Sequence, residues 1–291
     1  MAGRRGGVAY TLVGLVVCLV VLGVGAWVVL RWYRGRPVPA PVLPYQRCVA
    51  TVNGQSAELN PEQAHNAAII AGVSVQRGLP ARAASIALAT ALQESDLRNI
   101  DYGDRDSVGL FQQRPSQGWG SVEQIMDPHY STGKFYDALV KVKNWQNGDI
   151  NDVAQAVQRS GVPDGYRKHV ERAKILASAL SGETEAGFTC LARDPKPASP
   201  EAYQTLLRKT YGGTAQVAVA ADPPVRAEVA VASPQALWSV AAASQAWSQG
   251  HGVVSVQTAG RTWRASGSTL PQWAAATPAT DTSHVVVLFA G

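Results

Sequence analysis

The stretch ALQESDLRNIDYGDRDSVGLFQQRPSQGW, residues 91–119, is the most informative part of the sequence. The residues that lead into it, from Pro80, predict a helix that is apolar on more than one face and therefore central. Glu94 lies near the carboxyl end of this helix. Burial and the negative end of the helix dipole both disfavour a charged carboxylate, so we expect a raised pKa, which a general acid requires. Glu94 is therefore a candidate catalytic acid; the alternative is a surface glutamate at a helix end.

A polar, turn-rich loop follows Glu94 and leads back to a short apolar segment that ends in two amides. The loop spans residues 99–106, and the amides are Gln112 and Gln113. Amides hydrogen-bond in both directions, which suits the neutral hydroxyl and N-acetyl groups of sugars. The arrangement predicts a polar cleft beside Glu94. Trp119 offers a flat face for a sugar ring, although packing is the simpler expectation for this residue alone.

Several motifs resemble those of the lysozyme-like superfamily, in which soluble lytic transglycosylases and goose-type lysozymes are the nearest groups. Residues 91–95 and 109–112 look like its Glu-Ser and Gly-Leu-Met-Gln motifs, and residues 103–105 are similar to the goose-type loop. Residues 156–161 resemble the Ala-Tyr-Asn-Ala-Gly segment of the transglycosylases. The resemblance covers about residues 60–180 and implies a mainly α lysozyme-like domain in a bacterial protein.

The resemblance also implies a reaction, the cleavage of the β-1,4 bond between N-acetylmuramic acid and N-acetylglucosamine in peptidoglycan. Glu94 would protonate the glycosidic oxygen. In the transglycosylase route the same residue then acts as base, and the 6-hydroxyl of the sugar closes a 1,6-anhydro product. In the goose-type route a second acid activates water. Asp104 matches the first goose-type acid, whereas Arg114 occupies the position of the other, so both routes stay open.

The same resemblance implies further residues that contact the glycan strand. They are Ser95, Gln112, Gln113, Gln158 and Tyr166. Val157 and Gln158 stand where Tyr-Asn is typical, and we expect Gln158 to replace the missing amide in part. Tyr166 is expected to support Glu94 by a hydrogen bond. The departures leave an alternative function open, namely a catalytically inactive module that binds the cell wall or docks to a partner.

Sequence patterns of other site classes are absent. The five histidines are scattered, and the sequence contains no His-Glu-x-x-His pattern, no Gly-x-Ser-x-Gly elbow, no P-loop and no dinucleotide fingerprint. We therefore expect no metal and no cofactor.

The N-terminal 34 residues predict a cytoplasmic stub and one transmembrane helix. Residues 6–30 carry no charge, and an uncharged apolar stretch of this length can cross a bilayer as a helix. We place the membrane contact at residues 8–30. Two arginines before this run suit a cytoplasmic start. The alternative is a signal peptide cleaved near residues 24–26. Both interpretations export the rest of the chain, and the anchor predicts a single-pass protein of the cell membrane with extracellular folded domains.

The charge distribution argues against a nucleic-acid partner. The formal net charge is +5, but residues 1–36 alone contain five arginines and no acid, which leaves 21 basic and 21 acidic residues in the rest of the chain. Nucleic-acid binding would need a basic face on the folded part.

Two cysteines bracket the region that resembles lysozyme. Cys48 and Cys190 lie at its two ends, and export favours a disulfide between them. In the chain-entropy model so long a loop contributes on the order of 4 kcal/mol. We therefore assign residues 48–190 to the lysozyme-like domain.

Proline-rich stretches separate this domain from its neighbours. Residues 35–47 predict an extended linker that follows the membrane anchor (residues 1–34), and residues 191–213 predict a second linker. Beyond it, alternating apolar residues predict strands around one helix, which makes residues 214–291 a small α+β domain. Docking to a protein partner in the cell envelope is one open role for this domain.

Overall fold

The structure is a computed structural model that describes residues 19–28, 30–31, 45–193, 195–220, 222–276 and 281–290. About half of the predicted membrane contact at residues 8–30, namely residues 8–18 and 29, lies outside the described ones, as does most of the predicted linker at 35–47. Across the described part of the chain, none of the helices combines the length and the apolar character that a bilayer crossing requires. Residues 1–43 and 44–291 are separate units.

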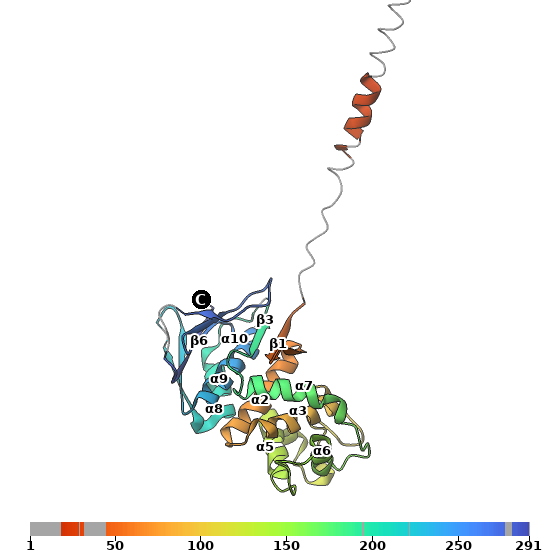
Figure 1. Ribbon diagram of the computed structural model, residues 1–291, viewed down its shortest axis with the longest axis vertical. Coiled ribbons are helices and arrows are strands. Elements are labelled where there is room, and N and C mark those ends of the chain that lie inside the picture. The colour runs from red at the N-terminus through yellow and green to blue at the C-terminus, as the bar shows by residue number, and fades with distance from the viewer. Residues whose placement is uncertain are drawn as a thin grey trace, which may run out of the picture. The chain divides into compact units, whose positions relative to one another are not determined.

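The first half of the larger unit consists of helices and a small antiparallel sheet with the strand order β2-β1-β3 (Figure 1). The helices are α2 (Pro61–Gln76), α3 (Ala81–Ser95), α4 (Val122–Ile125), α5 (Pro128–Leu139), α6 (Ile150–Gln158) and α7 (Val170–Leu180), and the strands are β1 (Arg47–Val52), β2 (Gln55–Leu59) and β3 (Phe188–Leu191). Cys48 on β1 lies opposite Cys190 on β3, and a disulfide joins them. The predicted disulfide is confirmed.

Local sequence explains where the first helices begin and why α3 is central. The Asn60 side chain accepts the backbone N–H of Gln63 at 2.9 Å, and the Gln63 side chain accepts the backbone N–H of Asn60 at 3.0 Å. This capping box starts α2, with Pro61 in the first turn. Ile86 and Leu88 of α3 are fully buried, and α3 packs against α2, α6 and α7. Helix α3 therefore lies in the interior of the unit, surrounded by these three helices.

The second half is built on a larger antiparallel sheet with the order β4-β5-β9-β6-β7-β8. Its strands are β4 (Ala215–Ala220), β5 (Arg226–Val231), β6 (Val253–Thr258), β7 (Arg261–Arg264), β8 (Ala274–Ala275) and β9 (His284–Phe289), and its helices are α8 (Pro200–Tyr211), α9 (Pro234–Ala246) and α10 (Ser248–His251). The described chain is thus a mixture of helices and antiparallel sheets, and the α+β character expected of the C-terminal part is found.

The region predicted as a second linker, residues 191–213, contains helix α8. Pro200 occupies the first turn, and Tyr203, Leu207 and Tyr211 are fully buried. Their spacing of four residues places them on one face of the helix, which packs against α2 and β4. The segment is thus not an extended linker throughout: two prolines precede the helix, and the third, Pro200, begins it.

The two halves pack closely through α9, which contacts both α2 and α7 (Figure 1). Ser239 on α9 donates to the carbonyl of Leu180 at 2.7 Å, and the Trp247 indole N–H donates to the carbonyl of His65 at 3.4 Å. One hydrophobic core runs through both halves. The helical half is therefore held rigidly against the sheet.

Candidate active site

Glu94 is held at a tightly fixed end of α3. Asp96 and Leu97 both adopt left-handed backbone conformations, with φ of 52° and 60°, and this ends the helix at Ser95, the residue after Glu94. Side chains from α2 hold the turn: Gln63 donates to the carbonyl of Asp96 at 3.0 Å, and Asn66 donates to the carbonyl of Leu97 at 2.8 Å. Left-handed backbone at non-glycine residues is costly, and such strain clusters at functional sites. The motifs of the sequence did not indicate Gln63 or Asn66.

Two predicted residues meet the carboxylate of Glu94. The hydroxyl of Tyr166 donates to Glu94 Oε1 at 2.6 Å, and Nε2 of Gln158 donates to the same oxygen at 3.3 Å. Gln158 Nε2 also donates to the carbonyl of Phe111 at 2.8 Å. Among the described residues, none donates a hydrogen bond to the second oxygen, Oε2. The expected hydrogen bond between Tyr166 and Glu94 is present.

Tyr166 remains a hydrogen-bond donor at any ordinary pH. Its side chain is fully buried. Burial is the main cause that raises the pKa of the Tyr166 phenol far above its usual range, and the hydrogen bond to Glu94 raises it further. The phenol therefore keeps its proton and holds Glu94 Oε1 as an acceptor.

The other predicted glycan contacts make bonds within the fold. Ser95 donates to the carbonyl of Leu110 at 2.8 Å and so ties the end of α3 to the Gly-Leu-Phe-Gln turn. Gln113 is buried and donates to the carbonyl of Ser131 at 3.2 Å. Gln112 is partly buried and donates to the carbonyls of Tyr102 and Gly109 at 3.2 and 3.3 Å. These three residues shape the loop that follows Glu94, and Gln158 and Tyr166 are the predicted residues that touch the carboxylate.

Asp104 is on the exposed part of the loop. Its side chain is 90% exposed and lies 3.9 Å from the guanidinium of its neighbour Arg105. No contact joins Asp104 to Glu94 in the part of the chain that the structure describes. Gly103 allows a close approach within the loop, because a Cβ at that position would lie 2.7 Å from the backbone carbonyl oxygen of Ser107.

Arg114, at the position of the second goose-type acid, belongs to a small ionic cluster. Its Nε lies 2.7 Å from Asp106 Oδ1, and Ser116 donates to Asp106 through its backbone N–H at 2.8 Å and its hydroxyl at 3.0 Å. The hydrogen bond from Arg114 is the main cause that holds the pKa of Asp106 well below its usual range. Asp106 is therefore ionised and structurally engaged.

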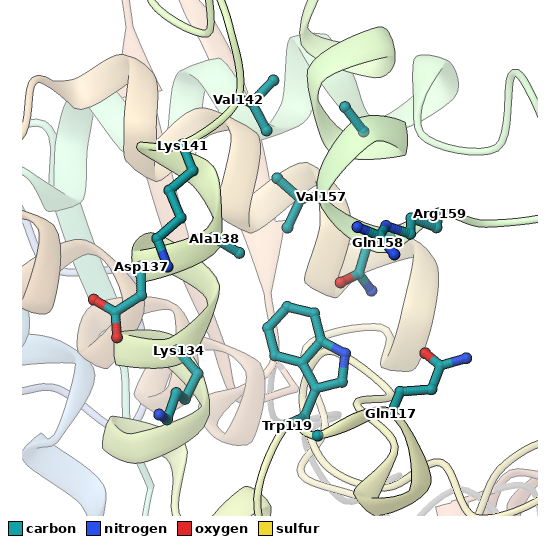
Figure 2. Close-up of a pocket in the computed structure, with 12 residues that line it drawn as sticks. Gln117, Trp119, Lys134, Asp137, Ala138, Lys141, Val142, Val157, Gln158 and Arg159 are labelled. Carbon is teal, nitrogen blue, oxygen red and sulfur yellow. The ribbon is translucent and has the colours of Figure 1, made fainter.

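A cavity of about 790 Å³ lies beside Gln158, the residue that hydrogen-bonds Glu94 (Figure 2). Its lining comes from the turn after the Gly-Leu-Phe-Gln segment, from α5 and the turn that follows it, and from the end of α6. The residues are Gln117, Gly118, Trp119, Lys134, Asp137, Ala138, Lys141, Val142, Ala156, Val157, Gln158 and Arg159. Trp119 was expected mainly to pack. Its side chain is partly buried against the core, and it also lines the cavity.

The cations of this cavity were missed in the sequence, although a signal was present. Lys134, Asp137 and Lys141 follow the spacing i, i+3, i+7, which places side chains on one face of a helix. The family motifs did not cover this segment, and no role was predicted for its polar side chains. Within the described residues, no three His, Cys, Asp or Glu side chains come together as a metal site would require.

Comparison with known proteins gives no family assignment. A scan against protein-family models and a search of curated proteins both found no match to this chain. Function must therefore be inferred from the residues and the geometry described above.

Proposed function

We propose that this protein cleaves the β-1,4 bond between N-acetylmuramic acid and N-acetylglucosamine in peptidoglycan, with Glu94 as general acid and then base. One observation carries the proposal: Glu94 Oε1 accepts hydrogen bonds from Tyr166 and Gln158, and Gln158 lines a large cavity. A carboxyl group that is held through one oxygen, by a residue that itself lines a cavity, is suited to transfer a proton from its other oxygen.

The hydrogen-bond pattern assigns a role to each oxygen of Glu94. Because Oε1 accepts from Tyr166 and Gln158, the proton of the neutral acid belongs on Oε2. In the proposed reaction Oε2–H protonates the glycosidic oxygen as the C1–O bond breaks. The resulting carboxylate keeps its two donors, which stabilise the charge formed in that step.

The environment of Asp104 favours the transglycosylase route over the inverting hydrolase. An inverting enzyme needs a second carboxylate to activate water across the sugar ring. Asp104 is almost fully exposed beside Arg105, and Asp106 is engaged with Arg114. In the transglycosylase route Glu94 alone serves both steps: its carboxylate accepts the proton of the 6-hydroxyl as that oxygen bonds to C1. The product then carries a 1,6-anhydro end.

The disulfide supports a place outside the cytoplasm. Cys48 and Cys190 are joined, and such bonds persist in oxidising compartments. We propose a single-pass protein anchored through residues 8–30 with its folded part outside the cell membrane, where peptidoglycan is its partner. A contact of the C-terminal half with another cell-envelope protein is part of the same proposal.

Replacing Glu94 with glutamine tests the proposal. Glu94→Gln keeps the size of the side chain and removes the transferable proton, so release of muropeptides from purified peptidoglycan is expected to fall by at least about 100-fold. Glu201→Gln is the matched control, because Glu201 is exposed on α8. Mass spectrometry of wild-type products is expected to show anhydro ends.

Two outcomes would count against this function. Equal muropeptide release by wild type and Glu94→Gln would remove Glu94 from the reaction. Binding of wild type to glycan strands without any turnover would instead favour the inactive wall-binding module. Reducing ends in place of anhydro ends would leave glycan cleavage standing and replace the transglycosylase route with hydrolysis.

A further inference from the structure

We infer that the cavity lined by Gln158, the hydrogen-bond partner of Glu94, binds a carboxylate carried by the glycan through Lys134, Lys141 and Arg159, and thereby selects acidic over neutral strands. The inference rests on the proposed function, because it concerns the substrate of the same site. It adds a specificity-determining set of cations, which we call the cationic rim.

The lining of the cavity has a local excess of positive charge. It contains three cations, the members of the cationic rim, and one acid, Asp137. Asp137 is already paired with Arg77, which lies outside the lining. The chain beyond residue 36 has equal numbers of basic and acidic residues, so this excess does not reflect a basic protein surface in general. A hollow lined by one sign of charge attracts ligands of the opposite sign.

The members of the cationic rim form no ion pair with any acid among the described residues. Lys134 Nζ lies 5.4 Å from the centre of the Tyr130 ring. Lys141 and Arg159 are exposed and form no side-chain hydrogen bond or salt bridge with any described residue. All three charges are thus available to a ligand. By contrast, cations such as Arg77 and Lys209 are paired with acids of the fold.

The backbone at Arg159 adds an independent observation. Arg159 ends α6 in the left-handed conformation, with φ of 53°. Glycine is the usual residue at this position of a helix because it has no Cβ. The chain instead places there a long cationic side chain that lines the cavity. A charge kept at a position where glycine would be less strained is expected to contribute to function.

The rim surrounds a surface suited to a sugar. Figure 2 shows Lys134 and Lys141 on one side of the view, Gln158 and Arg159 on the other, and the indole of Trp119 between them. A sugar ring packed against Trp119 would place its substituents near the cations, with Gln158 linking the cavity to Glu94. The geometry therefore joins recognition of an anion to the site of cleavage.

The carboxylate on the glycan has two chemical sources. In strands without peptides it is the lactyl group of N-acetylmuramic acid, and in substituted strands it belongs to the attached peptide. A neutral chitin oligosaccharide has neither. Both sources present the same group to the rim, and the experiment separates them.

Binding measured in the Glu94→Gln background tests the inference without any need for turnover. The ligands are peptide-bearing glycan fragments, peptide-free fragments with lactyl carboxylates, and chitin oligosaccharides of the same length. The double variant Lys141→Gln/Arg159→Gln is expected to raise the Kd for carboxylate-bearing fragments about tenfold and to leave the chitin Kd unchanged. The fragment class that loses affinity identifies the source.

Two further variants control this measurement. Lys143→Gln/Arg208→Gln removes the same two residue types from exposed positions outside the lining, and we expect less than a twofold change for every ligand. Lys141→Arg/Arg159→Lys keeps both charges and is expected to retain most of the affinity. Thermal melting of each variant checks that the fold is intact.

Failure of this inference can be told apart from failure of the proposed function. Equal Kd values for carboxylate-bearing and neutral ligands, or equal losses in the rim variant and its control, would overturn the inference. Wild-type turnover of peptidoglycan with unchanged KM in the rim variant would do the same while glycan cleavage stands. Rim-dependent binding in a protein that never cleaves glycan would support the inference and refute the enzyme.

Discussion

At the scale of single residues, Tyr166 is expected to act on the proposed reaction through its hydrogen bond to Glu94. The phenol is buried and keeps its proton, so Glu94 Oε1 has a permanent donor 2.6 Å away. A hydrogen bond to a carboxylate is stronger than one to a neutral group. Its effect should therefore grow as Glu94 gives up its proton in the proposed reaction. Tyr166 is in this sense a positioning residue.

Tyr166→Phe is expected to lower kcat for peptidoglycan cleavage about tenfold with little change in KM. The free energy of unfolding should fall by about 1 kcal/mol, the typical value of one buried hydrogen bond. Steady-state kinetics and urea unfolding measure the two effects.

A second buried tyrosine provides the control for this substitution. Tyr136 donates to the carbonyl of Ile70 at 2.9 Å. Tyr136→Phe should cost similar stability and leave kcat unchanged. An equal loss of kcat in both variants would mean that Tyr166 matters only for the fold.

At the scale of elements, the sequence predicted those that carry the motifs better than those that do not. The end of α3 near Glu94 and the hydrogen bond from Tyr166 to Glu94 were predicted from short local motifs, and the structure brings Glu94, Gln158 and Tyr166 together. Strands β1 and β3 were not predicted, because they are short and pair with each other across about 140 residues. The separation of 142 residues between the linked cysteines shows this distance along the chain. Local patterns contain no information on such pairing.

Helix α8 was not predicted, for a different reason. Its apolar positions, Tyr203, Leu207 and Tyr211, have helical spacing, but the proline-rich residues before them favoured a linker. The structure shows why the helix forms: its aromatic face completes the core beside α2. The proline-rich composition favoured an extended linker, but packing of α8 against α2 and β4 stabilises a helix in this segment.

The contact between α2 and α8 depends on Gly72, and this gives a test of its tightness. A Cβ at Gly72 would lie 2.4 Å from Thr210 Cγ2 and 3.0 Å from Tyr211 Cζ. Gly72→Ala should therefore lower the free energy of unfolding by about 1–3 kcal/mol, as overpacking usually does. Thermal or urea unfolding measures the effect.

Gly133→Ala is the matched control for this packing. Gly133 is also inside a helix, α5, but the nearest atom to its added Cβ would be Arg77 Nη1 at 3.9 Å. Alanine has the higher helix propensity, so this variant should be neutral or more stable by up to about 1 kcal/mol. A stable Gly72→Ala protein would show that α2 and α8 separate at little cost.

At the scale of the whole molecule, two largely buried histidines, His65 and His129, contribute to the response of stability to acid. Burial lowers the pKa of His65 to about 4, and burial with the nearby charge of Lys209 lowers the pKa of His129 to about 4. His129 bridges the two halves of the fold, because its Nε2 lies 2.9 Å from Thr210 Oγ1 on α8. Both rings are therefore neutral in the folded protein at neutral pH.

The sign of the pH dependence follows from these values. The unfolded chain has ordinary histidines with a pKa near 6.5, so between pH 6.5 and 4 it binds more protons than the folded protein does. Above pH 6.5 these two histidines do not reduce the free energy of unfolding. As the pH falls from 6.5 toward 4, the free energy of unfolding decreases by up to about 3 kcal/mol for each histidine. His129→Gln, which can still hydrogen-bond Thr210, should reduce the loss between pH 7 and 4.5 by about 2 kcal/mol. Urea unfolding at both pH values measures this difference, and parallel losses in wild type and variant would show that protonation of His129 does not destabilise the junction between the halves.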